Sequence, residues 1–184
     1  VVISLLDDSA TVDEDNSVAI AVLSNDTLST HTYGFSIETS APTNGQVLLN
    51  TDDTISYVPE ADFNGSDAFT YTVLVDDRSG SANVNVTINA VNDTPIINDL
   101  VGSIGISEGQ TSVLTVSASD VEGDTLTYSL TGTDASLLSI SSAGVITFNT
   151  APAYATKSLY SITVNVSDGT DSASEALIIT ITNP

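Results

Sequence analysis

Short segments in which large apolar residues alternate with Thr, Ser or Asn constrain the fold of this chain more than any other feature. A two-residue period is typical of a strand with one buried face, and Val, Ile and Thr favour strands. No segment keeps the 3.6-residue apolar period of a long helix. We therefore predict an all-β fold of antiparallel Greek-key β-sandwiches. The alternating segments are residues 69–75, 84–88, 160–166 and 177–181.

The sequence also repeats loosely after about 92 residues, a length typical of one domain. Thr87-Ile88-Asn89 returns as Thr180-Ile181-Thr182, and Asp26 has a counterpart in Asp120. Turn signals such as Asn44-Gly45 separate the predicted strands. We predict two tandem sandwich domains, residues 1–94 and 95–184, joined by a segment too short to act as a flexible tether.

The charge of the chain is extremely one-sided. Its 184 residues include 24 Asp and Glu but only two Lys and Arg, which gives a formal net charge of −22. Because 41% of the residues are hydrophobic, the chain has the apolar material for a core and is not expected to be disordered. Two cations cannot neutralise a phosphate backbone, so nucleic acid and anionic membrane surfaces are excluded as partners. The missing positive charge must come from outside, and calcium prefers carboxylate oxygens.

Most of the acidic residues fall where predicted strands end. Alternating acids in a turn, such as Asp120-x-Glu122-x-Asp124, converge on one cation when the backbone curves. The pair Asp76-Asp77 marks another such strand end. A single cluster is more often a group of solvated loop carboxylates, whereas six clusters in an almost cation-free chain favour metal. We expect Asp52, Asp53 and Asp134, outside these clusters, to be ordinary solvated charges.

Several motifs in the second half resemble bacterial cadherin-like repeats, found in large calcium-binding surface adhesins. The segment Val91-Asn92-Asp93-Thr94-Pro95 resembles the cadherin linker D-x-N-D-N-x-P, and Ile106-Ser107-Glu108 resembles the first-strand glutamate motif. The segments at 118–124 and 164–169 resemble the A-x-D-x-D-G and V-x-A-x-D motifs, and Gly144-Val145-Ile146 resembles the T-G-x-I hairpin. The first half resembles a related bacterial type.

The resemblance implies calcium at the junction between the repeats. It matches Asn92 and Asp93 to the linker ligands, and Asp120, Glu122 and Asp168 to the rim of the following domain. Together with the acidic clusters, it gives the candidate calcium ligands Glu14, Asp62, Asp67, Asp76, Asp77, Asn92, Asp93, Asp120, Glu122 and Asp168. A further group comprises Asp15, Asp26, Glu108 and Asp124.

Departures from the cadherin pattern predict fewer ions than the three of a cadherin junction. The first linker aspartate is replaced by Ala90, and the acidic L-D-x-E cluster of the second half reads Ala151-Pro152-Ala153-Tyr154-Ala155. We therefore expect one or two ions at the junction and weak binding or none at the far end of the second half. Glu108 would face that far end.

The predicted function is a calcium-binding tandem module of an extracellular or cell-surface bacterial adhesin. Its expected partners are calcium, neighbouring repeats and a homophilic protein partner or extracellular polysaccharide, without membrane insertion. The alternative is a polysaccharide-binding module attached to an enzyme, with exposed aromatic side chains as stacking platforms; Tyr154 is the best candidate among Tyr33, Phe35, Tyr57 and Tyr154. The chain itself is not expected to be an enzyme, since its single histidine, His31, lies in a polar segment without a nucleophile motif.

Overall fold

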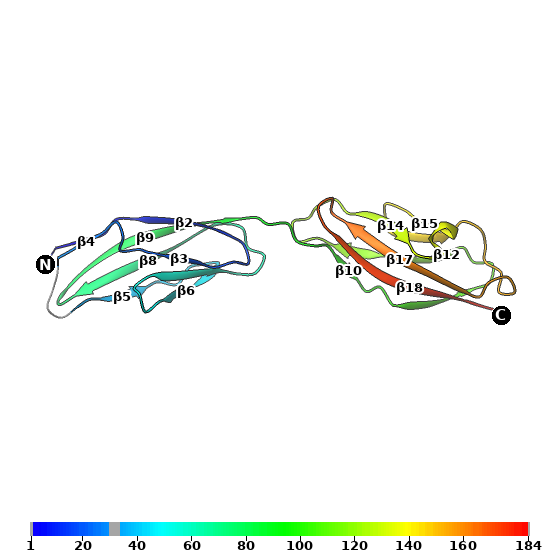
Figure 1. Ribbon diagram of the computed structural model, residues 1–184, viewed down its shortest axis with the longest axis horizontal. Helices are drawn as coiled ribbons and strands as arrows, with labels where there is room; N and C mark the ends of the chain where they lie inside the picture. Colours follow the sequence, from blue (N-terminus) through cyan, green and yellow to red (C-terminus); the bar gives the residue numbers. More distant parts are fainter. Residues whose placement is uncertain (1, 30–33, 184) are drawn as a thin grey trace. The chain divides into compact units, whose positions relative to one another are not determined.

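The computed structural model describes residues 2–29 and 34–183, so His31 and Tyr33 lie outside the described residues. The chain divides into two compact units, Val1–Val91 and Asn92–Pro184, and both are built from strands (Figure 1). Each unit is a sandwich of a four-stranded and a three-stranded sheet, with a two-stranded pair beside them. The predicted all-β fold of two tandem sandwiches is confirmed.

The described residues of unit 1 form nine strands. Its four-stranded sheet has the order β2-β9-β8-β5, its three-stranded sheet the order β3-β7-β6, and β1 pairs with β4. The strands are β1 (Ile3–Ser4), β2 (Asp8–Asp13), β3 (Val18–Ile20), β4 (Thr27–Leu28), β5 (Ser36–Thr39), β6 (Gly45–Leu49), β7 (Ile55–Pro59), β8 (Gly65–Val75) and β9 (Arg78–Asn89).

Unit 2 repeats this plan with sheets β11-β18-β17-β14 and β12-β16-β15, and β10 pairs with β13. One short 3-10 turn, η1, precedes β15. The elements are β10 (Ile96–Asn98), β11 (Ser103–Ser107), β12 (Ser112–Thr115), β13 (Ser117–Ser119), β14 (Thr127–Thr131), η1 (Ala135–Leu137), β15 (Leu138–Ile140), β16 (Val145–Phe148), β17 (Leu159–Ser167) and β18 (Ser172–Thr182).

The four-stranded sheet of each unit departs in one feature from the predicted antiparallel pairing. In each unit an early strand lies parallel to the last one: β2 to β9 in unit 1, and β11 to β18 in unit 2. The paired strands stand near the two ends of their unit in the sequence, so no short hairpin forces them to run antiparallel. The remaining pairings are antiparallel, as predicted.

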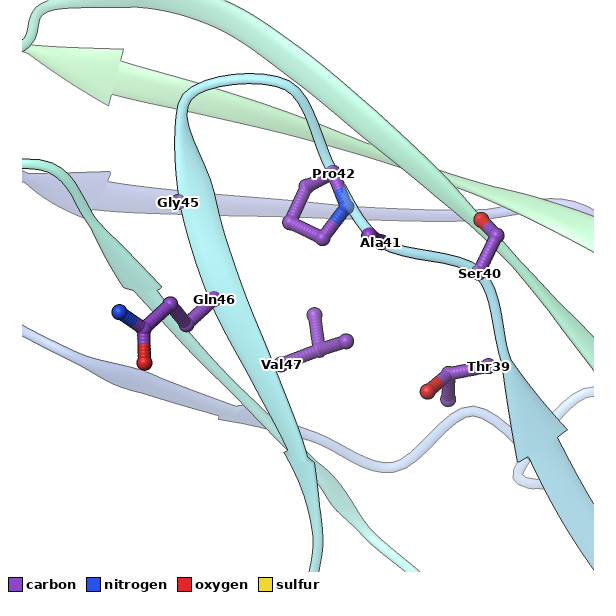
Figure 2. Close-up of a pocket in the computed structure, with 7 residues that line it drawn as sticks. All are labelled: Thr39, Ser40, Ala41, Pro42, Gly45, Gln46 and Val47. Carbon is purple, nitrogen blue, oxygen red and sulfur yellow. The ribbon is translucent and has the colours of Figure 1, made fainter.

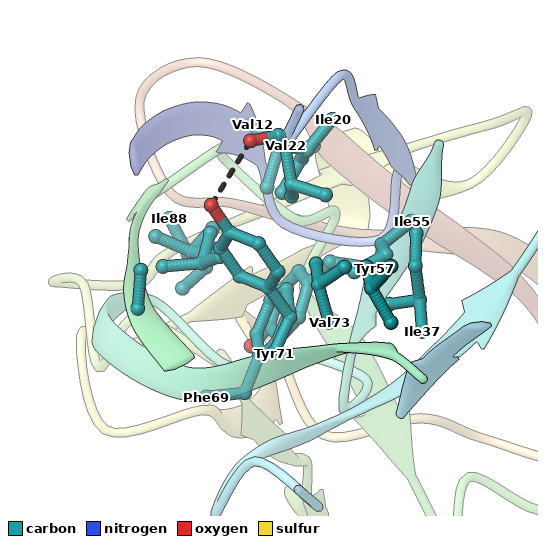
Figure 3. Close-up of a cluster of buried hydrophobic side chains, with 14 residues drawn as sticks. Val12, Ile20, Val22, Ile37, Ile55, Tyr57, Phe69, Tyr71, Val73 and Ile88 are labelled. Atoms are coloured by element: carbon teal, nitrogen blue, oxygen red, sulfur yellow. Dashed lines mark hydrogen bonds between the residues drawn. The ribbon is translucent and has the colours of Figure 1, made fainter. Parts of the chain in front are cut away.

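The core of unit 1 is made by the inward residues of the alternating strands. Along β8 the side chains of Phe69, Tyr71 and Val73 are buried, while the residues between them face outward (Figure 3). Tyr71 crosses the core, and its hydroxyl lies 3.1 Å from the carbonyl oxygen of Val22. Each such apolar side chain contributes roughly 1.5–3 kcal/mol when fully buried. The two-residue period in the sequence therefore becomes the inner face of the sheet.

Asp134 contradicts the prediction that it is an ordinary solvated charge. It lies just before η1, is only 5% exposed, and forms an ion pair with Lys157. Its carboxylate also accepts a hydrogen bond from the backbone N–H of Ser161 (2.8 Å). The hydrogen bond from Lys157, followed by that from Ser161, lowers the pKa of Asp134. The Lys157 ammonium also lies 5.0 Å from the centre of the Tyr160 ring. One of the two cations of the chain is therefore paired with a carboxylate of its own unit.

Gly144, in the turn before β16, is expected to tolerate no side chain. Its φ is +75°, and a Cβ there would lie 2.3 Å from the carbonyl oxygen of Val116. We expect Gly144→Ala to destabilise the chain by roughly 2–4 kcal/mol, measured by urea denaturation followed by circular dichroism. Gly109→Ala is the matched control, because Gly109 has a φ of +80° with nothing within 4 Å of the added Cβ. Equal losses in the two variants would contradict a role for the close approach to Val116.

Candidate metal-binding site

Glu14 stands at the end of unit 1 from which the linker leaves. Its backbone N–H bonds the carbonyl of Asn89, the last residue of β9. The side chain is only 1% exposed, and its carboxylate accepts a short hydrogen bond from the Val91 N–H (2.6 Å). A second bond, of 3.4 Å, comes from the Asn64 amide. Glu14 therefore ties the start of the linker to the body of unit 1.

Asp15 and Asp62 are exposed neighbours at this same end. The Asp62 N–H donates to the Asp15 carboxylate (3.2 Å), which joins the turn after β2 to the turn before β8. Both residues have positive φ values, 59° for Asp15 and 58° for Asp62, a conformation that Asp tolerates better than most residues. Among the predicted ligands of unit 1, Glu14, Asp15 and Asp62 are thus gathered at the linker end.

Asp67 has a structural role that the sequence did not reveal. It lies inside the sandwich, 8% exposed, and its carboxylate accepts four hydrogen bonds. The donors are the N–H groups of Thr43, Asn44 and Ala68 and the hydroxyl of Tyr57, at 2.8–3.1 Å. These bonds fill the acceptor positions of both oxygens. Asp67 therefore acts as an internal hydrogen-bond acceptor and not as a candidate ligand.

Asp76 and Asp77 lie at the other end of unit 1. They form the exposed turn between β8 and β9, beside Arg78, the first residue of β9. Glu14 is hydrogen-bonded to Asn89, the last residue of β9. Because β9 has 12 residues, these two ends are about 35–40 Å apart. Asp76 and Asp77 therefore cannot share an ion with Glu14.

Asp26 is held within the body of unit 1. One carboxylate oxygen accepts from the Leu6 N–H (2.8 Å) and the other from the buried Tyr71 hydroxyl (2.7 Å). Burial, followed by the negative charge of Asp26, raises the pKa of the nearby Asp8. Asp26 and Asp8 thus form an acidic pair around a core tyrosine, separate from the linker end.

In unit 2, Asn92 joins two acidic residues of the turn between β17 and β18. Its side-chain amide donates to the carboxylates of Asp168 (3.1 Å) and Asp171 (3.0 Å). Asp168 in turn accepts from the N–H groups of Asp171 and Thr170, and these two bonds lower its pKa, with a smaller contribution from Asn92. The predicted ligands Asn92 and Asp168 are brought together, and Asp171 joins them although it was not in the predicted set.

The same end of unit 2 holds a second group of predicted ligands. The Asp93 N–H donates to the Glu122 carboxylate (3.1 Å), and the Asp124 N–H donates to Asp120 (3.0 Å). The other oxygen of Asp120, Oδ2, is buried and has no hydrogen-bond partner among the described residues. A buried carboxylate oxygen without a donor is costly unless a cation or water meets it. This oxygen is therefore chemically suited to a metal ion.

Glu108 lies at the far end of unit 2, as expected. Its N–H bonds the carbonyl of Thr182 at the end of β18, whereas Asp168 lies next to the start of that strand. The Glu108 carboxylate accepts from the Tyr154 N–H (2.8 Å), within the segment that lacks the acids of the cadherin pattern. Glu108 thus supports a local turn in unit 2.

The comparisons with known proteins agree with this architecture. A model of the bacterial Ig domain matches the chain twice, at residues 2–89 and 92–182. The chain belongs to the bacterial Ig domain family. Among curated proteins, no sequence is significantly similar to it.

Solved cadherin structures share the fold of this bacterial Ig pair at low identity. Human CDH23 EC21-23 has a TM-score of 0.64 at 20% identity, with 96% of this chain and 67% of that chain covered. Human mucin-like protocadherin EC1-2 has a TM-score of 0.60 at 15% identity, covering 100% and 99%. Protocadherin gamma B7 domains 1-4 have a TM-score of 0.58 at 16% identity. The match covers 99% of this chain and 51% of that chain, so this chain spans about half the length of that structure. Identities this low show a shared fold.

The aromatic residues considered as sugar-stacking candidates differ in exposure. Tyr57 is fully buried, as a core residue, and cannot stack on a sugar. Tyr154 in unit 2 is 46% exposed, and Phe35 in unit 1 is 41% exposed. The described part of the chain contains no helix long and apolar enough to cross a membrane.

Proposed function

We propose that this bacterial Ig pair is a calcium-binding tandem module of a secreted or cell-surface adhesin. Calcium would stiffen the link between its two repeats. The family assignment and the cadherin-like fold support this proposal, because both point to arrays of small sandwiches. The role is binding and mechanical rather than catalytic.

The observation that carries the proposal is the unbalanced acid at the start of unit 2. Asp168 and Asp171 both accept hydrogen bonds from the neutral amide of Asn92, and one buried oxygen of Asp120 has no donor among the described residues. Lys157, the only basic residue of unit 2, precedes β17 and is paired with Asp134, whereas Asp168 follows β17. A divalent cation supplies the positive charge that these carboxylates lack.

The proposed ligands in unit 2 are Asp and Glu carboxylates and the side-chain amide of Asn92, and their oxygens are hard donors. A calcium ion binds 6–8 oxygens and tolerates irregular geometry, so it suits side chains drawn from several turns. The proposed ligands in unit 2 are Asn92, Asp93, Asp120, Glu122 and Asp168, with Asp171 added and Asp124 nearby.

Unit 1 contributes through the covalent continuity of the linker. The Val91 N–H donates a hydrogen bond to Glu14, and the side-chain amide of the next residue, Asn92, donates hydrogen bonds to Asp168 and Asp171. Ions held jointly by the Glu14, Asp15 and Asp62 end and by the Asn92 end would restrict rotation about this segment. We expect one or two ions.

Isothermal titration calorimetry with calcium tests the proposal directly. The chain is expected to bind calcium saturably, and Asp120→Ala is expected to weaken binding on the order of tenfold or more, about 1.4 kcal/mol. Glu175→Ala is the control, because Glu175 is an exposed carboxylate on β18 of the same unit and makes the same charge change. If the chain shows no saturable calcium binding, or if both variants lose the same affinity, the proposed sites are wrong.

A further inference from the structure

Strand β6 of unit 1 has one side that pairs with no strand in the described structure. It is the last strand of the sheet β3-β7-β6. The bonds Glu60 N–H to Asn44 (2.8 Å) and Asn50 N–H to Thr54 (2.8 Å) fix the pairing register on both sides of β6. Because antiparallel pairs alternate, the backbone groups of Gly45, Val47 and Leu49 then point away from β7. Three residues therefore present backbone donors and acceptors at a free edge.

This edge lacks the usual protection against pairing with another strand. Natural edges carry charged side chains, proline or a bulge, or lie under a loop. The segment Gly45–Leu49 has no charge and no proline, although the chain contains 24 acidic residues. Leu48 is 67% exposed and Leu49 40% exposed. The segment is thus both apolar and accessible.

A groove without charged side chains runs beside β6. Its lining comes from the end of β5, the following loop and the start of β6, and Figure 2 shows Val47 and Thr39 directed into the space between them. The loop is fixed by Asp67, which bonds the N–H groups of Thr43 and Asn44. The lining residues are Thr39, Ser40, Ala41, Pro42, Gly45, Gln46 and Val47.

The equivalent edge of unit 2 is not available in the same way. Strand β15 has only three residues and follows η1 directly. The register turns the Leu138 carbonyl away from β16, and the Asn149 side chain donates to that carbonyl (3.4 Å) and to Ser136 (3.1 Å). The open edge is therefore a property of unit 1 rather than of the repeat.

We propose that β6 pairs antiparallel with β6 of a second copy of this chain, around a two-fold axis at Val47. Gly45 would then face Leu49 of the second copy, which allows about six backbone hydrogen bonds over three residue pairs. Continuing the register places Asp52 opposite Pro42, so no two carboxylates oppose each other along these strands. The uncharged edge is thus complementary to itself.

The expected dimer is weak and does not depend on calcium. Five residues bury much less than the roughly 1,200 Å² of a stable interface, and two chains of net charge −22 repel each other. Salt screens this repulsion, with a Debye length of about 8 Å at physiological ionic strength, so added salt should strengthen association. The pairing uses unit 1 alone, so it can succeed or fail independently of the proposed calcium function.

Cysteine trapping tests the pairing register, since the chain has no cysteine of its own. The axis at Val47 places Gln46 opposite Leu48 of the second copy as a non-hydrogen-bonded pair, with Cα atoms about 4.5 Å apart, within disulfide range. Under mild oxidation with EDTA present, a mixture of full-length Gln46→Cys and Leu48→Cys chains is expected to form disulfide dimers several-fold faster than either variant alone. The side chains of Gln46 and Leu48 are both exposed, so neither substitution disturbs the core.

Leu159→Cys sets the rate of random collision, because Leu159 is 55% exposed and lies in unit 2. Circular dichroism melts check that each variant is folded. Adding Leu48→Glu to the Gln46→Cys chain and mixing it with Leu48→Cys chains should slow trapping to the Leu159→Cys rate. Equal rates for the mixture, the single variants and the Leu159→Cys control would overturn the proposal. The same result is expected if the edge pairs with a strand of another protein, so that case also counts against pairing between copies.

Discussion

Removal of calcium with EGTA is expected to lower the melting temperature of this chain by about 10 °C or more. Ligand binding adds about 2.7 kcal/mol at a hundredfold excess over Kd, and 1 kcal/mol shifts a domain of this size by roughly 4–8 °C. Extracellular calcium modules bind with Kd values of roughly 10⁻⁴–10⁻³ M, so the measurement requires calcium at tens of millimolar. Calorimetric melts with calcium and with EGTA give the shift.

The control for this prediction is magnesium at the same concentration. Mg²⁺ screens charge as calcium does, but it demands near-ideal octahedral geometry and gives up its waters reluctantly. A shift that magnesium reproduces in full would show general screening of the −22 charge instead of specific sites. X-ray scattering under the same conditions tests the linker, because profiles that superimpose with and without calcium would exclude stiffening.

The second large effect is expected at Asp67, where Asp67→Asn should destabilise unit 1 by roughly 3–5 kcal/mol. The asparagine keeps the shape of the side chain but replaces one acceptor oxygen with a donor. Its NH2 group would then face either the N–H groups of Thr43 and Ala68, which now donate to Oδ1, or the N–H of Asn44 and the Tyr57 hydroxyl, which now donate to Oδ2. Urea denaturation followed by circular dichroism measures the loss, and Asp77→Asn, at an exposed turn, serves as the control.

The same carboxylate predicts a dependence on pH. Burial opposes ionisation of Asp67, but the bonds from Asn44, Ala68 and Tyr57 outweigh it and hold its pKa below the ordinary value. A depressed pKa in the folded state contributes stability that is fully present above the unfolded pKa of about 3.9. This stability is lost as the pH falls through the lower folded value. Asp67→Asn should therefore be less acid-sensitive than the parent chain, and an unchanged slope below pH 4 would contradict this role.

The strands and the repeat were predictable because they are local or periodic properties of the sequence. Alternation from Phe69 to Val75 gives the inner and outer faces of β8 directly. The parallel pairing of β2 with β9 was not predictable, because it joins residues such as Asp8 and Val84 that no local pattern connects.

The acidic residues show the same limit. Asp62 and Asp67 belong to one short acidic segment, yet Asp62 is exposed at the linker end and Asp67 is buried under four hydrogen bonds. Strand alternation offers the missing signal: Asp67 shares the inward parity of Phe69 and Tyr71. The burial of Asp134 was not predictable for a different reason: its partner Lys157 lies 23 residues away in the sequence.

The parallel pairing of the first and last long strands also bears on how each unit responds to mechanical load. In unit 1 the chain enters β2 at Asp8 and leaves β9 at Asn89, and the register places these residues at opposite ends of the paired segment. Tension applied through the two ends of the unit therefore pulls the strands past each other and loads the whole row of hydrogen bonds together. A hairpin pulled from its open end would instead lose its bonds one at a time. Forced unfolding is governed by the unfolding rate, so this geometry favours a repeat that withstands stretching.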